Sequence, residues 1–209
     1  SRTPPPNVSD LAWAKNPIDS FILAKLEAAN LKPSREADRA MLLRRVHLDL
    51  VGQIPSTEAV NEFLNDRREN KRALVVNELL SDPAYVRHFA TVWTNLLVGR
   101  SMEREVDRFA VHRFLRESFG RNRPWCQVVY ELVAAEGPVE ENGASGFLLA
   151  HLNNEPVPAT AITARLFLCQ QVQCTQCHKH PFNEADQSQF WELNSFFKQT
   201  EIEHRPMRD

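Results

Sequence analysis

The apolar residues of this chain recur at steps of three and four, and this spacing limits its possible folds more than any other feature. Phe89, Trp93 and Leu97 are one example, and the same spacing returns between successive proline and glycine breaks. Side chains spaced in this way share one face of an α-helix, whereas a half-buried strand alternates apolar and polar residues. No stretch of such alternation is found in the sequence. We therefore predict an all-α fold, an irregular bundle of about eight short helices.

Capping residues and prolines predict where the helices begin. Proline suits the first helical turn, and Ser, Thr, Asp or Asn just before a helix can accept hydrogen bonds from its free amides. The region between residues 139 and 159 is rich in Gly, Asn and Pro, so it is expected to be the longest irregular segment, with an apolar island at Phe147-Leu148-Leu149. The expected helix starts lie at or just after Asn16, Asp38, Ser56, Asp82, Glu103, Pro124, Thr160 and Asp186.

The sequence predicts a proline-rich lead-in followed by one domain. Pro4-Pro5-Pro6 favours a stiff, extended segment of the kind that joins domains. We expect residues 1–15 to be a linker or lead-in and residues 16–209 to form a single all-α domain. A chain of 209 residues, of which 43% are hydrophobic, is long enough to bury a substantial core.

The charge balance and hydropathy argue against two classes of partner. The 25 Lys and Arg residues nearly cancel the 27 Asp and Glu residues, leaving a formal net charge of -2. Such a chain has no overall positive field to attract nucleic acid or an anionic membrane. It also lacks an apolar run of about 18 residues, and Ser1–Asp10 has neither the basic nor the apolar part of a signal peptide. We expect neither nucleic-acid binding nor membrane insertion by this chain.

The strongest functional motif is Cys174-Thr175-Gln176-Cys177-His178, placed just before the last predicted helix. Two cysteines three positions apart, followed at once by histidine, form the pattern that attaches a c-type haem. In that arrangement the thiols of Cys174 and Cys177 bond the haem vinyl groups, and His178 ligates the iron. The sequence therefore predicts a haem c site in the loop before the last helix.

Other chemistry of the same thiols remains open. Cys174, Cys177 and a histidine, His178 or His180, could hold a structural zinc ion, with Cys169 as a further ligand. A dithiol redox pair is the weaker alternative, because such pairs usually follow a strand in a βαβ unit. Cys169 also falls in line with Ile162 and Leu166 of a predicted helix, and we expect it to be a small buried hydrophobic residue.

The haem interpretation assigns further residues. His180 is only two residues from His178 and cannot easily reach the opposite face of the same ring, so we expect it to orient His178 or to hydrogen-bond a propionate. The sixth ligand position decides between electron transfer and ligand chemistry. Its candidates are Met102, Met207, His112 and His151.

Three stretches resemble one known family. Asn16–Ile22, Leu42–Thr57 and Cys174–Phe182 are similar to the planctomycete cytochrome-associated family, also called domain of unknown function 1549. The resemblance implies a place in a large exported bacterial protein beside a cytochrome c domain and a second uncharacterised domain. It also implies electron transfer linked to polymer breakdown. Two positions depart from the family: Cys169 stands where relatives usually carry glycine, and Asn95–Ser101 differs from the usual run.

We therefore expect an electron-transfer module of a larger extracytoplasmic, periplasmic or exported, protein, because haem c is attached outside the cytoplasm. The neighbouring domains of the same polypeptide are its expected partners, and the sequence identifies no redox partner protein. The alternative is a structural or interaction domain stapled by zinc. An enzyme that uses Asp49 or Glu136 has less support, since either carboxylate is equally typical of a helix surface.

Overall fold

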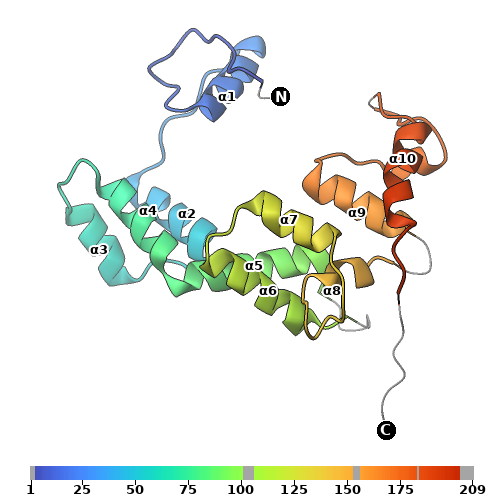
Figure 1. The fold of residues 1–209 in the computed structure, drawn as a ribbon. Coiled ribbons are helices and arrows are strands. Elements are labelled where there is room, and N and C mark those ends of the chain that lie inside the picture. Colours follow the sequence, from blue (N-terminus) through green and yellow to red (C-terminus); the bar gives the residue numbers. More distant parts are fainter. Residues whose placement is uncertain (1–2, 101–105, 153–155, 183, 203–209) are drawn as a thin grey trace. The chain divides into compact units, whose positions relative to one another are not determined.

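In the parts of the chain that the structure describes, the helices follow one another without intervening strands. The computed structural model describes residues 3–100, 106–152, 156–182 and 184–202, and within these ranges it holds ten α-helices, one 3-10 helix and no β-strand. The prediction of an all-α fold is confirmed, with more helices than the eight or so expected. In chain order (Figure 1) the elements are α1 (Pro17–Ala28), α2 (Arg39–Val51), α3 (Thr57–Asn65), α4 (Lys71–Ser81), α5 (Pro83–Val98), α6 (Arg108–Gly120), α7 (Trp125–Val133), α8 (Ser145–Leu149), α9 (Val157–Phe167), the 3-10 helix η1 (Gln173–Gln176) and α10 (Gln187–Phe197).

Side-chain caps explain why several helices begin where the sequence predicts. Asn16 accepts hydrogen bonds from the backbone amides of Ile18 and Asp19, and the Asp19 carboxylate accepts one from the Asn16 amide. This reciprocal arrangement satisfies amides that have no partner inside the helix. Ser56 caps α3, and Asp82 caps α5. Each of these helix starts depends on residues only a few positions apart, so the sequence alone could predict it.

The chain divides into two compact units, residues 1–44 and residues 45–209. In the first unit, Leu23 is buried on α1, and the Ser9 amide donates a hydrogen bond to Glu27 on the same helix. The second unit holds all of the elements from α3 onward. No helix among the described residues is both long and apolar enough to cross a membrane.

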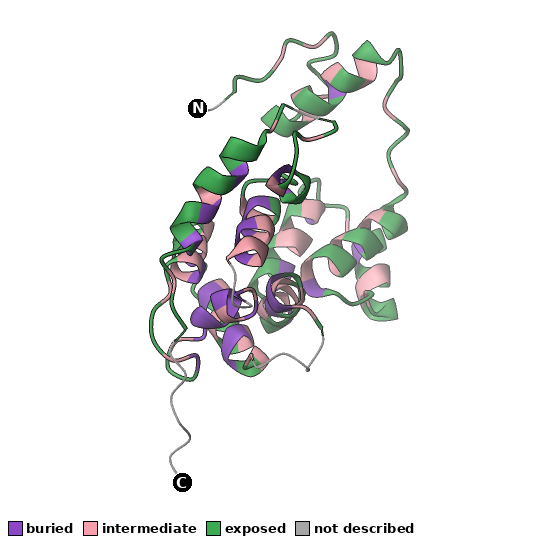
Figure 2. Cartoon of the chain, turned by 90° about the vertical axis from the view of Figure 1, so that its right-hand side faces the viewer, coloured by how far each residue is buried: buried purple, intermediate pink, exposed green. Residues whose placement is uncertain are grey.

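The core of the second unit lies where α5 to α8 meet, and α9 and α10 extend it. The buried sides of these helices stand out against their exposed sides in Figure 2. Burial of the apolar faces of such helices supplies most of the free energy that holds them together. Its buried members include Leu97 of α5, Val111 and Leu115 of α6, Leu132 of α7, Phe147 of α8, Ala159 of α9 and Phe197 of α10.

The expectation of an irregular segment between residues 139 and 159 is wrong in its middle. Ser145–Leu149 form the short helix α8, and Phe147 within it is fully buried. Its neighbour Gly143 lies against α6, where an added Cβ would come within 2.2 Å of the Ala110 carbonyl oxygen. Glycine therefore serves close packing here, whereas in the sequence it indicates a loop.

The buried side chain of Lys71 caps the C-terminal end of α3. Only 8% of its surface is exposed, and its ammonium group donates hydrogen bonds to the carbonyls of Phe63 and Asp66, both at 2.8 Å. The ammonium also lies over the Phe63 ring, 4.8 Å from its centroid. A cation at a helix C-terminus offsets the partial negative charge of the free carbonyls.

Replacing Lys71 by methionine is therefore expected to lower the free energy of unfolding by about 2 to 3 kcal/mol, since hydrogen bonds to a charged group are lost while the aliphatic stem is kept. Urea unfolding followed by circular dichroism measures this change. Lys25→Met, at an exposed position of α1, should change the stability by less than about 0.5 kcal/mol. Equal effects of the two substitutions would contradict the prediction.

Candidate functional site

The segment that carries Cys174 is held onto α9 and α10 by its inward side chains. Thr175 is fully buried, and its hydroxyl donates a hydrogen bond to the Val172 carbonyl at 2.7 Å. Val172 is itself buried against Ala164 of α9 and Phe190 of α10. These contacts fix one side of η1 against the helices and turn the other side outward.

Both cysteines of the motif lie on the outer side of this turn. The Cys177 amide donates to the Cys174 carbonyl at 3.5 Å, a long bond of 3-10 type. A 3-10 helix has about three residues per turn, so side chains three positions apart stack on the same side. Cys174 and Cys177 are free and exposed thiols. The local geometry therefore suits two bonds to one flat ligand edge.

His178 follows directly and is exposed. Its Nδ1 lies 2.7 Å from the backbone carbonyl oxygen of Lys179. Because a carbonyl oxygen only accepts hydrogen bonds, Nδ1 must carry the hydrogen, and the neutral ring then has its lone pair on Nε2. Histidines that bind metals usually donate their other ring N–H to a carbonyl or carboxylate in this way.

His180 has the opposite arrangement. Its Nδ1 accepts a hydrogen bond from the Phe182 amide at 3.1 Å, so in the neutral ring the hydrogen lies on Nε2. Its backbone amide donates to the Ala185 carbonyl at 2.9 Å, which closes the loop between η1 and α10. The two histidines thus differ in chemistry: His178 presents a lone pair at Nε2, and His180 presents an N–H donor there.

The start of α10 supports the far end of this loop. Asp186 caps the helix, accepting hydrogen bonds from the Ser188 hydroxyl at 2.7 Å and from the Gln189 amide at 3.2 Å. The pKa of Asp186 lies below its usual value, chiefly because of the Ser188 hydroxyl. The Gln187 side-chain amide donates to the Gln176 carbonyl at 3.0 Å. The predicted cap is confirmed, and α10 is tied directly to η1.

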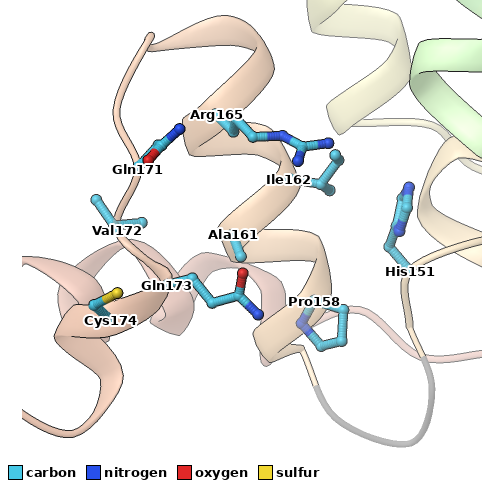
Figure 3. A pocket seen from close by; sticks show the side chains of 9 residues that line it. All are labelled: His151, Pro158, Ala161, Ile162, Arg165, Gln171, Val172, Gln173 and Cys174. Carbon is cyan, nitrogen blue, oxygen red and sulfur yellow. The ribbon is translucent and has the colours of Figure 1, made fainter.

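A pocket of about 370 Å³ opens beside Cys174. In Figure 3 the Cys174 sulfur lies on one side of it and the His151 ring on the other, with side chains of α9 between them. Among the lining residues that the structure describes, Arg165 carries the only formal charge and none is acidic. Cys177 and His178 do not line the pocket. Its lining consists of His151, Pro158, Ala161, Ile162, Arg165, Gln171, Val172, Gln173 and Cys174.

The structure separates the candidates for a sixth ligand. Met102 and Met207 lie outside the described residues. His112 of α6 lines a different pocket together with Arg113 and Arg116, and burial is the main cause that lowers its pKa, with Arg116 and Arg108 adding to the effect.

His151, by contrast, shares the pocket with Cys174. Its Nε2 donates a hydrogen bond to the Leu97 carbonyl at 2.7 Å, and its ring meets Phe147 edge-on at 5.4 Å between centroids.

The α9 side of the pocket was not predicted. Pro158, Ala161, Ile162 and Arg165 are spaced like one helix face, a signal that the sequence contains. We missed this face because the helix was expected to start at Thr160, whereas α9 begins at Val157 and so includes Pro158. A mixed face of proline, alanine and arginine also gives a weak pattern.

The expectation that Cys169 is a buried hydrophobic residue is wrong. Cys169 is exposed, lies two residues beyond the end of α9, and has a backbone φ of 55°. The following amide, of Gln170, donates to the Ala164 carbonyl at 3.0 Å. Helices often end with one residue in this left-handed conformation, which glycine adopts without steric cost. The apolar spacing in the sequence continued two residues past the end of the helix.

Cys169→Gly is therefore expected to raise the free energy of unfolding by up to about 1 kcal/mol, since glycine relieves the left-handed strain but adds freedom to the unfolded chain. Thermal and urea unfolding measure the gain. Cys169→Ala keeps the Cβ atom and should show no comparable increase. A loss of stability in the glycine variant would contradict this assignment of the helix end.

No three His, Cys, Asp or Glu side chains gather closely enough to hold a metal ion among the residues that the structure describes. No curated protein and no solved structure matches the chain. The model of one family does match, over residues 17–202, and its description reads "PSCyt2: Protein of unknown function". Since this match spans most of the 209 residues, the chain belongs to the PSCyt2 family, DUF1549.

Proposed function

We propose that this chain is a c-type haem-binding module that transfers single electrons. The observation that carries the proposal is the combination at η1: two exposed thiols on the same side of an anchored 3-10 turn, followed by a histidine whose Nδ1 hydrogen bond leaves a lone pair on Nε2. A dithiol redox pair would not need the adjacent histidine. Thiols on a buried turn would not be accessible to a haem.

The residues fit the group that the motif implies. Cys174 and Cys177 would hold the haem through thioether bonds, and His178 would ligate the iron through Nε2. His180, which presents an N–H at its Nε2, would hydrogen-bond the haem edge without ligating the iron. When bound, the haem supplies a one-electron couple whose potential depends on its ligands and on neighbouring charges. The protein's own part is to orient His178 and to set those charges.

The same proposal includes the setting of the chain. Haem attachment implies a location outside the cytoplasm, and the motif resemblance implies a large exported protein of a planctomycete or a related bacterium. Electrons would then pass between this module and a neighbouring cytochrome c domain of the same polypeptide. The exposed position of the loop, with Phe182 91% exposed beside it, suits exchange with another domain.

The direct test is to export the chain from a host that has haem-attachment machinery and to examine the purified protein. We expect a Soret band and a mass increase of one covalently bound haem. Colourless protein that carries one zinc ion per chain under these conditions would support the alternative, a structural domain stapled by Cys174, Cys177 and a histidine.

A further inference from the structure

The pocket beside Cys174 has a charge pattern that suits one part of a haem. Among its described lining residues the only formal charge is the Arg165 guanidinium, located in the last turn of α9. Among the described residues no carboxylate lies within ion-pair distance of Arg165. A guanidinium without an acidic neighbour is a ready partner for a carboxylate ligand, which it can bind through two parallel hydrogen bonds.

Apart from Arg165, the α9 side of the pocket is apolar. Pro158, Ala161 and Ile162 form one side of α9, and the side chain of Ala161 is short enough to let a flat ring approach the helix. Across the pocket lie the polar side chains of His151, Gln171 and Gln173. Cofactor sites commonly combine an apolar surface with polar groups that converge on it. The face continues along the helix to Arg165.

The two ends of the pocket match the two sides of a haem. Its vinyl groups and its propionates stand on different sides of the macrocycle, so a haem tethered at Cys174 would direct its propionates away from that sulfur. We propose that the α9 face of this pocket receives the haem and that Arg165 pairs with a propionate. This inference rests on the proposed function, and it adds the residues that position the group and tune its potential.

Loss of the Arg165 charge should then favour the oxidised haem. We expect Arg165→Gln to lower the midpoint potential by an amount equal to about a tenfold change in the oxidised-to-reduced ratio, the size expected for one unit charge in a partly solvated site. For a one-electron couple this corresponds to about 59 mV. The released propionate should also titrate nearer to neutral pH, which makes the potential more pH-dependent. Arg165→Lys should preserve most of the wild-type behaviour.

The experiment uses the full chain carrying covalent haem, with potentiometric titration at several pH values and resonance Raman spectra of the propionate bending modes. Arg116→Gln is the matched control, since Arg116 lines the separate pocket of α6. The proposal is supported if Arg165→Gln alone shifts the potential and the propionate bands. If the potential, its pH dependence and the bands of Arg165→Gln match those of the wild type, the inference is overturned and haem binding stands. A wild-type chain without haem overturns both.

A second variant tests the floor of the pocket without using the potential. Ala161→Trp should fill the space above α9 and reduce the fraction of chains that carry haem by several-fold, as measured by intact-protein mass. Gln127→Trp, at an exposed position of α7, makes the same substitution elsewhere and should leave that fraction unchanged. Equal haem content in the two variants, with both folded by circular dichroism, would overturn the assignment of the α9 face.

Discussion

Replacing both Cys174 and Cys177 by serine is expected to abolish covalent haem in the exported protein. Serine keeps the size of the side chain but cannot form the thioether. Because both thiols are exposed and do not pack in the core, the fold should survive, and stability should change by less than about 0.5 kcal/mol. Intact-protein mass and the absorbance left after acid extraction of haem measure the loss.

The other cysteines and histidines supply the controls. Cys126→Ser, at an exposed position of α7, should retain full covalent haem. His178→Ala should change the spectrum of any attached haem far more than His180→Ala, because only His178 presents a lone pair at Nε2. Covalent haem in the double serine variant would refute the assignment of the attachment site. Equal spectra for the two histidine variants would refute the ligand assignment.

Phe147→Ala is expected to lower the free energy of unfolding by about 3 to 5 kcal/mol, which is a large share of the stability of a typical domain. Phe147 is fully buried at the centre of the core. Its ring contacts His151 and Phe167, at centroid distances of 5.4 and 5.6 Å. Removing it leaves a cavity among the surrounding core side chains.

Urea unfolding of haem-free and haem-carrying protein measures this effect. Phe182→Ala is the matched control, since Phe182 is 91% exposed and should change the stability by less than about 0.5 kcal/mol. Because the Phe147 ring contacts the ring of His151, which lines the pocket, its loss should also disturb the surroundings of the haem that we propose there. A destabilisation by Phe147→Ala below about 1 kcal/mol would show that α8 is not part of the core.

The sequence predicted those parts of the fold that depend on neighbours along the chain. Asn16, Ser56, Asp82 and Asp186 each cap the helix expected after them, because a cap needs only amides two or three residues away. The Cys174–His178 motif is likewise local in the sequence, and its role in haem attachment stays a prediction. The helical spacing of apolar residues was sufficient for the all-α class.

The predictions made from the sequence were wrong where contacts between distant residues determine the local structure. Gly143 and Gly146 indicated a loop, but both allow α8 to pack closely on α6. Cys169 continued a helical pattern, yet the chain turns there so that Val172 and Thr175 can be buried against α9 and α10. In both cases burial outweighed the local preference.

The sequence by itself determined that the chain is helical, where most helices begin, and which residues form the Cys-x-x-Cys-His motif, because each depends on spacing along one segment. Only the tertiary structure decided that Thr175 anchors the turn and that the thiols face outward, since burial is a property of the packed chain. It also decided that His151, Arg165 and Cys174 share one pocket. These residues come from three segments, and only their packing brings them together.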